Sequence, residues 1–479
     1  MLQRSVLHCR PNLTLLSTHL TTSRSHLRCL SSSSSPPPPP SSTVSVVPPP
    51  QTLNAPTPKS FSTPLEAALH KQIQTLGPLP LPTYTSLCMT HPTFGYYTTS
   101  NPLASDLNKG DFVTSPGLSQ AFGETLAAWA CYNLKEFRYV EYGPGDGTLC
   151  SDFLRTMSQL NRRPSECYLI DESPILIREQ HRTLGVTLDS YIHSKDDIPT
   201  QSIVVQTGLA KDGRTRVTWL KDLPPVNVKV PELIVCHEFL DALPAHVFQF
   251  KGGRWRERMV DINWEGEEEV KVEVNSQAYT GVKKQDLTEI SKSSNLRLVL
   301  SQTPTPALKT LLKTDGKGIS KLVPGKENEV IEIQPEALSL IQEFSTRISV
   351  NRGLALLIDY VGKGDTTRAF SDHEQVEVLE RPGECDITVS CDYDQYEKEV
   401  EGKGAVCWRR GQGEFLVECG MGNRVQSLIE SDDTTVEEAN KIYAGFEKIV
   451  EDMKTFEVMV IGGESNIQGV KRGTPIGFK

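Results

Sequence analysis

Residues 139–154 read Tyr139-Val-Glu141-Tyr-Gly143-Pro-Gly145-Asp-Gly147-Thr-Leu-Cys-Ser-Asp-Phe-Leu154. An apolar run ends at Glu141, three alternate glycines follow it, and a helical pattern begins near Thr148 or Leu149. Glycine lets the backbone adopt positive φ and approach a ligand closely, and a helix amino-terminus offers N–H groups to an anion. The stretch therefore predicts a strand–turn–helix unit that binds a nucleotide-like cofactor.

The spacing of the glycines separates this loop from two other nucleotide-binding loops. Gly143, Gly145 and Gly147 give G-x-G-x-G, whereas a dinucleotide fingerprint needs G-x-G-x-x-G and residue 148 is Thr. The P-loop is excluded because no Gly-Lys-Ser/Thr follows. An acid before such glycines, here Glu141, resembles the signature of methyltransferases that use S-adenosylmethionine.

A second acid stands where such a site needs one. Asp171 follows Gly147 by 24 residues, close to the roughly 20 residues expected when a crossover helix joins neighbouring strands. We expect Asp171 to accept hydrogen bonds from the ribose hydroxyls of the cofactor. In the alternative interpretation, residues 143–147 form only a tight turn and Asp171 caps the next helix.

Strands and helices alternate around this unit. The pattern predicts strands at 138–142, 166–171, 232–236, 354–360 and 456–461, and helices at 118–132, 149–160, 175–184 and 423–453. Such alternation predicts an α/β fold with a doubly wound parallel sheet, whose ligands lie at the carboxyl ends of the strands. Alternating apolar residues around Gly252-Gly253 predict a β-rich insertion at about 246–345.

The first 65 residues differ in composition from the rest. They contain four Arg, one Lys and no Asp or Glu, and Ser and Pro fill residues 31–40. Arginine and hydroxyl side chains without acids or a long apolar run are typical of organellar import sequences. We expect a targeting segment and disordered tether at 1–60, followed by one domain at 61–479 that opens with a helical extension at 61–135.

The body of the chain is acidic. Its remaining 414 residues hold 45 Lys and Arg against 60 Asp and Glu, a formal charge of −15. That charge disfavours nucleic acid as a partner but suits a basic protein target. The 11 cysteines include no C-x-x-C and no Cys/His zinc spacing, so we expect no metal site. No apolar run is long enough to span a membrane.

Motifs throughout residues 61–479 resemble, in order, those of the MidA-type S-adenosylmethionine-dependent protein-arginine methyltransferases. They are Lys109-Gly-Asp-Phe-Val-Thr-Ser-Pro, Ser119-Gln-Ala-Phe-Gly-Glu124, Gly143-Pro-Gly-Asp-Gly-Thr, Glu238-Phe-Leu-Asp-Ala-Leu-Pro244, Ile358-Asp-Tyr, Thr367-Arg-Ala-Phe370, Asp386-Ile-Thr388 and Gln412-Gly-Glu-Phe-Leu416. The resemblance implies a class I, Rossmann-like methyltransferase fold and S-adenosyl-L-methionine as cofactor. It also implies a mitochondrial, matrix location and an arginine of a complex I subunit as the substrate during complex I assembly.

The resemblance also supplies candidate site residues. A guanidinium must be oriented and must lose a proton, and carboxylates do both with fork-like hydrogen bonds. We expect Glu238 and Asp241 to grip the acceptor guanidinium, with His237 or His373 as a proton relay. Alternatively, Glu238 is a surface charge and Asp241 a helix cap.

The loop that contains Asp111 and Thr114 is expected to close over the cofactor. Its alternative interpretation is a turn in which Asp111 bonds its own backbone.

Four positions depart from the family pattern. The family usually has Glu where this chain has Gly117, Asn where it has His237, a basic residue near Asp146, and Gly where it has Val361. If these changes weaken the chemistry, the chain is a non-catalytic complex I assembly scaffold with a methyltransferase fold. A methyltransferase acting on another substrate is a further alternative, while the glycine spacing disfavours an NAD-dependent oxidoreductase.

Overall fold

The computed structural model describes residues 60–99, 114–188, 204–263, 272–274, 277–279, 287–290, 294–312, 324–464 and 474–478. These residues belong to one compact unit, Ala55–Lys479. Asp111 and residues 1–59 of the expected targeting segment and tether lie outside the described residues.

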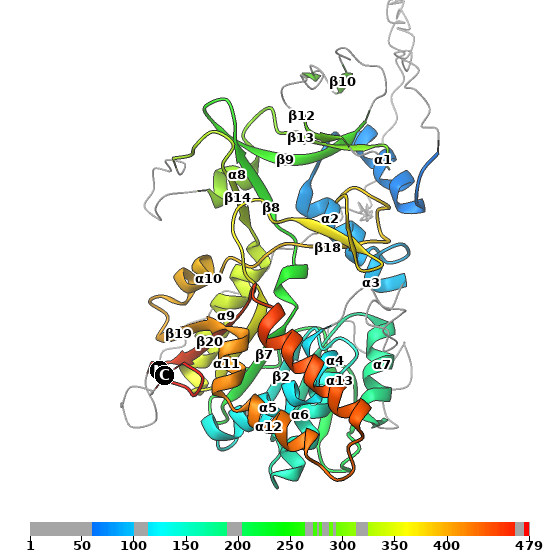
Figure 1. The fold of residues 1–479 in the computed structure, drawn as a ribbon. Helices are drawn as coiled ribbons and strands as arrows, with labels where there is room; N and C mark the ends of the chain where they lie inside the picture. The colour runs from blue at the N-terminus through cyan, green and yellow to red at the C-terminus, as the bar shows by residue number, and fades with distance from the viewer. Residues whose placement is uncertain are drawn as a thin grey trace, which may run out of the picture. The chain divides into compact units, whose positions relative to one another are not determined.

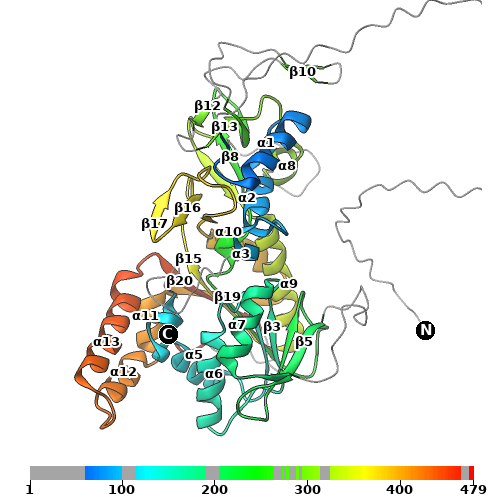
Figure 2. The ribbon, with the colours of Figure 1, turned by 90° about the vertical axis from the view of Figure 1, so that its right-hand side faces the viewer.

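A nine-stranded sheet carries the glycine loop (Figures 1 and 2). Its order is β19 (Ala405–Gly411), β20 (Phe456–Gly463), β15 (Leu354–Tyr360), β7 (Glu232–His237), β2 (Arg138–Tyr142), β3 (Cys167–Ile170), β6 (Arg216–Leu220), β5 (Val204–Leu209) and β4 (Thr187–Leu188). The five strands from β15 to β6 are parallel. Strand order reverses between β2 and β7, so a ligand crevice is expected at their carboxyl ends.

The five predicted strands are confirmed as β2, β3, β7, β15 and β20. Each of the four parallel ones is buried along almost its whole length, as expected for strands covered on both faces. Strands β4, β5 and β6 were not predicted.

Helices cover both faces of this sheet. One face packs against α5 (Gln120–Asn133), α6 (Thr148–Gln159), α7 (Pro174–Leu184), α11 (Gln412–Glu418) and α12 (Met421–Ile429). The other face packs against α9 (Pro335–Asn351) and α10 (Tyr393–Val400). The helices predicted at 118–132, 149–160 and 175–184 are confirmed within two residues. The predicted helix at 423–453 is instead α12, α13 (Val436–Glu447) and the π-helical turn η3 (Lys448–Asp452).

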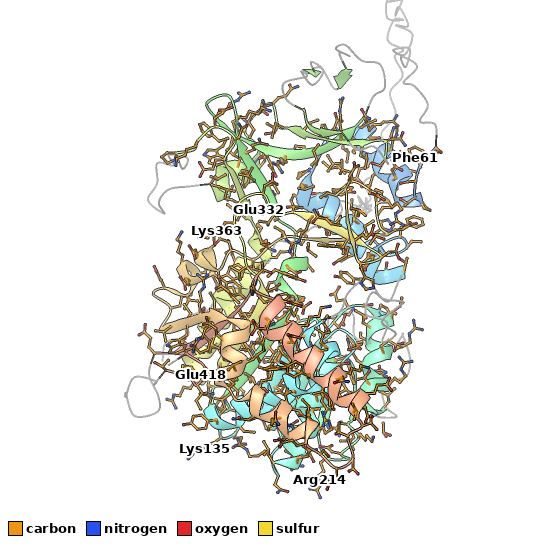
Figure 3. The ribbon with its side chains drawn as sticks, viewed as in Figure 1. Phe61, Lys135, Arg214, Glu332, Lys363 and Glu418 are labelled. Atoms are coloured by element: carbon orange, nitrogen blue, oxygen red, sulfur yellow. The ribbon has the colours of Figure 1, made fainter. Side chains whose placement is uncertain are left out.

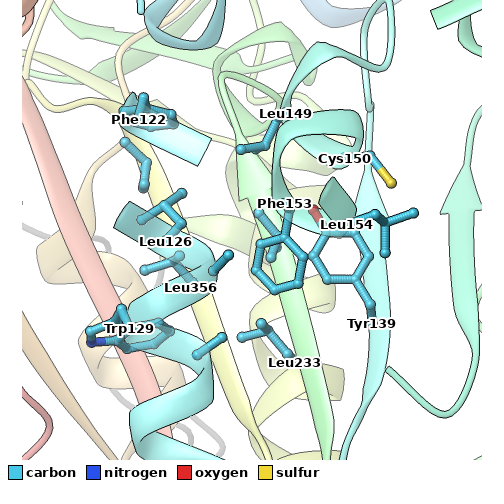
Figure 4. Close-up of a cluster of buried hydrophobic side chains, with 14 of the residues drawn as sticks. Phe122, Leu126, Trp129, Tyr139, Leu149, Cys150, Phe153, Leu154, Leu233 and Leu356 are labelled. Atoms are coloured by element: carbon cyan, nitrogen blue, oxygen red, sulfur yellow. The ribbon is translucent and has the colours of Figure 1, made fainter. Parts of the chain in front are cut away.

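Figure 4 shows the core beneath the glycine loop. Phe122, Leu126 and Trp129 of α5 form one apolar stripe, which packs in the same cluster as Phe153 of α6 and Tyr139 of β2. Fully burying a large apolar side chain stabilises a fold by about 1.5–3 kcal/mol. This packing therefore fixes α6, and with it the glycine turn that begins α6, against the strand ends.

A second sheet, of six strands, contains the predicted insertion. Its order is β12 (Leu287–Ile290), β13 (Leu296–Leu300), β9 (Trp255–Ile262), β8 (His246–Phe250) and β14 (Val330–Ile333), and β1 (Leu79–Pro80) pairs with β9. The hairpin predicted at Gly252-Gly253 is confirmed, because β8 and β9 pair antiparallel and both glycines have positive φ. Helices α1 (Pro64–Leu76) and α2 (Leu81–Thr90) share a core with this sheet, and α8 (Pro306–Leu311) packs in a smaller cluster.

The sequence predicts that the insertion extends to about residue 345. The last strand of the six-stranded sheet, β14, ends at Ile333, and α9 begins two residues later at Pro335. Ala337, Ile341 and Phe344 of α9 are buried in the core of the nine-stranded sheet. One residue, Gln334, therefore separates the two sheets' elements at this point of the chain.

The remaining elements are short, and several lie near the strand ends. They are the three-stranded sheet β17 (Glu374–Val376), β16 (Arg368–Ser371) and β18 (Asp386–Thr388), the hairpin β10 (Val272–Val274) and β11 (Gln277–Tyr279), and α3 (Tyr96–Thr99), α4 (Ser115–Leu118) and η1 (Leu240–Ala242). Within the part of the chain that the structure describes, no helix has the length and apolar character needed to cross a membrane.

Candidate active site

The glycine loop adopts the backbone conformation that its sequence predicts. Gly143, Gly145 and Gly147 have φ of 56°, 58° and 85°, a region that costs other residues strain. A Cβ at Gly143 would lie 2.6 Å from Cδ2 of Phe239, and one at Gly147 would lie 3.2 Å from Cα of Gln180. The loop thus needs glycine both for its backbone conformation and because Phe239 and Gln180 lie so close to it.

Glu141 is the next-to-last residue of β2, the strand that leads into this loop. Its side chain is buried, and Oε2 accepts a 2.8 Å hydrogen bond from the hydroxyl of Tyr139. Burial raises the pKa of Glu141 to about 8, and the nearby charge of Asp146 acts in the same direction. Glu141 therefore faces the loop as an acid that holds its proton at neutral pH.

Asp171 lies at the end of β3 and is tied to the glycine loop through Gln180. The Gln180 side-chain amide donates to Asp171 Oδ2 at 2.7 Å and to the carbonyl of Gly145 at 2.8 Å. The indole N–H of Trp219 donates to Gln180 Oε1 at 2.8 Å, and Gln180 is fully buried. Each atom of this amide is used, so Gln180 fixes the loop and the acid relative to each other.

Asp171 keeps capacity for a ligand. Besides the bond from Gln180, its Oδ1 accepts a 2.8 Å bond from the backbone N–H of Ser173. Burial raises the pKa of Asp171 to about 6, although these hydrogen bonds oppose the rise. Each carboxylate oxygen can accept a further bond, which fits the predicted contact with ribose hydroxyls.

His237 and Glu238 stand at the end of β7, across the strand-order reversal from the glycine loop. Glu238 has φ of +49°, an uncommon conformation for a residue with a side chain. Burial raises its pKa to about 8, while the nearby backbone N–H of Ser115 in α4 opposes the rise. Because Ser115 follows Thr114, the predicted loop residue Thr114 lies beside this site.

Two polar atoms here lack partners. His237 Nε2 and Glu238 Oε1 are 3.3 Å apart, yet neither makes a hydrogen bond within the described part of the chain. Burial lowers the pKa of His237 to about 3, so this contact is not an ion pair at neutral pH. An unsatisfied buried polar group is costly, and these two atoms are therefore suited to meeting a ligand.

Asp359, at the end of β15, organises the turn that carries Asp241. It is fully buried and accepts bonds from the N–H groups of Leu240 at 3.0 Å, Asp241 at 3.3 Å and Tyr360 at 2.9 Å. Burial, followed by the charge of Asp241, raises the pKa of Asp359 well above its usual range. Asp359 thereby fixes η1 against the sheet and sets the position of Asp241.

The β16–β18 wall, defined as Arg368, Phe370, Asp386 and Thr388, lies beside Asp241. The backbone N–H of Val389 donates to the carbonyl of Asp241 at 2.9 Å, immediately after Thr388. Burial raises the pKa of Asp241 to about 6, whereas the charge of Arg368 lowers it. In the sequence these wall residues stood out only as family motifs, because residues far apart in the chain become neighbours only when the chain folds.

Tyr97 of α3 joins the wall to the cofactor side. Its hydroxyl donates to Asp386 Oδ1 at 3.1 Å, and its carbonyl accepts a 2.8 Å bond from Ser173, two residues after Asp171. Helix α3 thus contributes directly to the candidate site. The sequence did not predict this contribution.

The structure brings most of the predicted site residues together. Phe239 joins the two halves, because it packs against Gly143 of the glycine loop and follows Glu238 directly. His373 does not lie at the candidate site, because it is exposed in the turn between β16 and β17.

The departures at Gly117 and His237 leave the site well packed. Gly117 is exposed, and a Cβ there would have only Thr114 Oγ1 within 4 Å, at 3.7 Å. His237 is buried against Phe122, with ring centroids 5.1 Å apart.

The residues present fit a nucleoside-type cofactor. Glycines with positive φ form the turn that leads into α6, and Asp171 offers acceptors one strand away. Beyond them, at the end of β7, lie the unpartnered atoms of His237 and Glu238. Among the described residues, no group of three or more His, Cys, Asp and Glu could hold a metal ion.

Comparisons with known proteins agree with this geometry. Residues 118–408 match the model of a family described as "Putative S-adenosyl-L-methionine-dependent methyltransferase". The protein called "Protein arginine methyltransferase NDUFAF7, mitochondrial" is 32% identical over 393 residues in Mus musculus, covering 79% of each chain. The Homo sapiens protein of the same name is 30% identical over 413 residues, covering 82% of each chain.

A solved structure shares the fold. A protein from Burkholderia thailandensis bound to S-adenosyl-homocysteine superposes with a TM-score of 0.61 at 21% identity, covering 84% of this chain and 92% of that one.

Proposed function

Because the chain belongs to the family of S-adenosyl-L-methionine-dependent methyltransferases, we propose that it is a mitochondrial protein-arginine N-methyltransferase. The observation that carries the proposal is the buried Glu238, whose unpartnered carboxylate oxygen lies at the strand-order reversal opposite the glycine loop. The names of its relatives support arginine as acceptor and the mitochondrion as location.

The order of the nine-stranded sheet supports a class I methyltransferase domain. The parallel strands run β6-β3-β2-β7-β15, and the antiparallel β20 lies between β15 and β19. In that interpretation, the β-rich sheet formed by β8 to β14 is an insertion after β7, and the helices before β2 are an extension.

The glycine loop, Glu141 and Asp171 are the residues that would hold S-adenosylmethionine. When bound, S-adenosylmethionine supplies a methyl group on a sulfonium, which a nucleophile can take by in-line displacement without a metal. Gln180 holds Asp171 and Gly145 in place. The chain's own contribution is therefore positioning and electrostatics.

Glu238 is the carboxylate proposed to receive the acceptor guanidinium. A guanidinium is a planar donor that carboxylates bind in a fork, and Glu238 Oε1 has no partner in the described structure. Ionised Glu238 orients the acceptor and takes up the proton that the guanidinium loses. His237 is neutral at physiological pH because burial lowers its pKa, so its ring can pass on a proton without repelling the cation.

The substrate is proposed to be a subunit of respiratory complex I, methylated in the matrix during complex I assembly. The support is the order of the motifs, which resembles that of the MidA-type enzymes, and the acid-free composition of residues 1–65. A basic, arginine-bearing protein also suits the −15 formal charge of the remaining chain.

The test is to incubate the full chain with labelled S-adenosylmethionine and a mitochondrial extract, and to locate the label by mass spectrometry. We expect it on an arginine side chain of a complex I subunit. Label on a different class of molecule would contradict the arginine assignment. Binding of S-adenosylhomocysteine without any transfer would instead favour the scaffold alternative.

A further inference from the structure

The small sheet β17-β16-β18 has two chemically different faces. Ala369 and Ile387, paired across β16 and β18, are buried in the core that the six-stranded sheet shares with α1 and α2. Side chains alternate between the faces of a strand, so the residues next to these two point the other way. That opposite face is the β16–β18 wall, on which Arg368 lies directly across from Thr388.

The guanidinium of Arg368 makes no hydrogen bond or ion pair within the described part of the chain, and its Nε is buried. Its contacts are two aromatic rings, because Cζ lies 5.1 Å from the ring centroid of Tyr360 and 5.7 Å from that of Phe370. Cation–π attraction at this range holds the side chain in place but supplies no hydrogen-bond acceptor. A guanidinium has five N–H donors, and those of Arg368 therefore remain available to a ligand.

Thr388 is a second residue of the wall with an unpartnered polar atom. It is 5% exposed, and its Oγ1 is buried without a hydrogen-bond partner in the described structure. A buried polar group without a partner is costly. Because residues paired across two strands share one face of a sheet, the unmet groups of Arg368 and Thr388 lie side by side on the wall.

The β16–β18 wall is joined to the turn that follows Glu238. The N–H of Val389, the residue after β18, donates to the carbonyl of Asp241 in η1 at 2.9 Å. Tyr360, whose ring contacts Arg368, is the last residue of β15 and so lies at the strand ends. Arg368 is therefore placed beside the candidate acceptor site and not beside the glycine loop.

The chain just before Arg368 is held firmly by Glu332 of β14. The Glu332 carboxylate accepts bonds from the backbone N–H and the hydroxyl of both Thr366 and Thr367. Figure 3 labels Glu332 at the lower end of the six-stranded sheet. The hydroxyl of Thr366 also accepts a 3.0 Å bond from the N–H of Ser390, beyond β18. Arg368 therefore starts from a fixed backbone.

Acidic side chains lie near the wall, which favours a neutral ligand. They belong to Glu238 before η1, Asp241 in η1, Asp359 in β15 and Asp386 in β18. A carboxylate ligand on Arg368 would be repelled by the ionised groups among them. A peptide carbonyl accepts from a guanidinium without adding charge, and a peptide N–H is a donor for Thr388 Oγ1.

We propose that Arg368 and Thr388 bind the main chain of the protein substrate next to the acceptor arginine. The Arg368 guanidinium donates to a peptide carbonyl, and Thr388 Oγ1 accepts from a peptide N–H. This inference rests on the proposed function and deepens it, because it makes the substrate an arginine within a peptide chain and not a small guanidine. Arg368 is a specificity residue, while Glu238 receives the acceptor guanidinium.

The test compares two acceptors at saturating S-adenosylmethionine, with the full chain as enzyme. One is a blocked pentapeptide with a central arginine between glycines; the other is n-butylguanidine, which has the guanidinium but no peptide unit. Arg368→Met should lower kcat/KM for the pentapeptide about tenfold or more, and Thr388→Val about threefold, mainly through KM. Both variants should leave kcat/KM for n-butylguanidine within about twofold of the unmodified protein. Equal losses for the two acceptors would overturn the inference.

Cofactor binding tests a different role for Arg368. S-adenosylhomocysteine has a carboxylate that methylthioadenosine lacks, and Arg368→Met should leave the affinity for both unchanged. A weaker affinity for S-adenosylhomocysteine alone would assign Arg368 to the cofactor carboxylate and overturn the inference.

Arg258→Met is the matched control for activity. All three nitrogens of Arg258 have partners, since Nη1 and Nη2 donate to Asp365 at 2.6 Å and Nε donates to Gln249 at 3.4 Å. Its kcat/KM for the pentapeptide should be unchanged. Arg368→Lys keeps the charge without the fork of donors and should retain more activity than Arg368→Met. A loss in Arg258→Met equal to that in Arg368→Met would overturn the inference.

Stability distinguishes a ligand-binding arginine from a structural one. Arg368 has no hydrogen bond or ion pair to lose, so the unfolding midpoint of Arg368→Met should equal or exceed that of the unmodified protein. Arg347→Met is the contrast, because Arg347 bonds to the buried Glu232 at 2.8 and 3.0 Å and its loss should lower the midpoint. A fall for Arg368→Met as large as that for Arg347→Met would show a structural role and overturn the inference.

Binding separates this inference from the proposed function. If the unmodified protein methylates neither acceptor nor any arginine of a mitochondrial extract, the proposed function fails. Fluorescence anisotropy of the labelled pentapeptide, with the protein saturated by S-adenosylhomocysteine, still measures main-chain binding. Arg368→Met should weaken that binding about tenfold. Equal binding by both proteins, or no binding by the unmodified protein, would overturn the inference.

Discussion

Glu238 combines a strained backbone, a largely buried side chain and an unpartnered oxygen in one residue. Its φ of +49° and its position after β7 direct the carboxylate to the strand ends. Strain and unsatisfied polar atoms persist where the surrounding fold imposes them, and they concentrate at functional sites. This combination supports Glu238, more than any other acid of the site, as the group that meets the substrate.

The raised pKa of Glu238 predicts a pH dependence. Glu238 must lose its proton to bind a guanidinium, and its pKa in the free protein is about 8, so kcat/KM should rise with pH and level off above about pH 8. The bound guanidinium stabilises the carboxylate, so kcat should level off at lower pH. Initial rates between pH 6 and 9.5 provide the check. A kcat/KM that is flat or falls over this range would contradict the assignment.

Glu141 predicts a change in stability with pH. The folded protein holds the Glu141 proton up to a pKa of about 8, whereas the ordinary value is 4.5. Between these values the folded state binds more protons than the unfolded state, so stability falls as pH rises. Glu141→Gln has no such proton to lose and can still accept the bond from Tyr139. Its unfolding midpoint should exceed that of the unmodified protein by about 4 °C at pH 8.5 and match it near pH 5; equal midpoints at both pH values would refute this.

Sequence could predict some site residues and not others for a physical reason. The glycines, Glu141 and Asp171 belong to short local patterns at strand ends, where spacing carries information, whereas Glu238 was indicated by the resemblance to a family. Gln180 and Arg368 act through side chains that meet only in the folded protein. A glutamine within a helix, and an arginine on a three-stranded sheet, have no local signature of these contacts.

At the scale of elements, the turn between β2 and α6 is the part of the fold most dependent on its sequence. Gly147→Ala would place a Cβ 3.2 Å from Cα of Gln180 at a φ of 85°. We expect the affinity for S-adenosylhomocysteine to fall about tenfold or more, because the loop and Gln180 must separate. Titration calorimetry provides the measurement.

Gly253→Ala is the matched control for that change. Gly253 also has positive φ, at 76°, but a Cβ there would have open space in the hairpin turn between β8 and β9. Gly253→Ala therefore introduces backbone strain like that of Gly147→Ala, but at a position that does not contact the site. Gly147→Ala should lose more stability than Gly253→Ala, because only its Cβ meets a neighbouring backbone, and equal losses of cofactor affinity would show that the effect is not local to the glycine loop.

The elements that sequence predicted are those with strong periodicity. Strands β2, β7 and β15 have at least five residues each and are built around apolar side chains, and α5 to α7 have clear apolar stripes. Strands β16 and β18 have three or four residues and carry a polar face. Their pairing depends on Glu332 and on the insertion core, so no local pattern indicated the wall that they form.

At the scale of the whole molecule, the chain places two cores around one site. The nine-stranded sheet supplies the glycine loop, Glu238 and Asp359, while the core of the insertion and the extension supplies the β16–β18 wall and Tyr97. Residues from both are bonded to each other at Asp241 and Val389. Helix α3 and the small sheet of β16 and β18 therefore complete the candidate site.

The composition of the first 60 residues gives a prediction for the cell. A fluorescent protein fused behind residues 1–60 should enter mitochondria, because the segment has arginines and no acids. Changing Arg4, Arg10, Arg24 and Arg28 to glutamine should leave the fusion in the cytosol. Imaging against a mitochondrial marker provides the check, and import of the glutamine variant would contradict the electrostatic reading of the segment.

The central claim is that Glu238 receives the acceptor arginine opposite a cofactor site that does not depend on it. The most direct measurement compares methyl transfer to arginine by the unmodified protein and by Glu238→Gln, with the S-adenosylhomocysteine affinity of each. We predict a loss in kcat/KM of about a hundredfold or more, with an affinity changed by less than about twofold. Unimpaired transfer by Glu238→Gln, or an equal loss of both quantities, would contradict the claim.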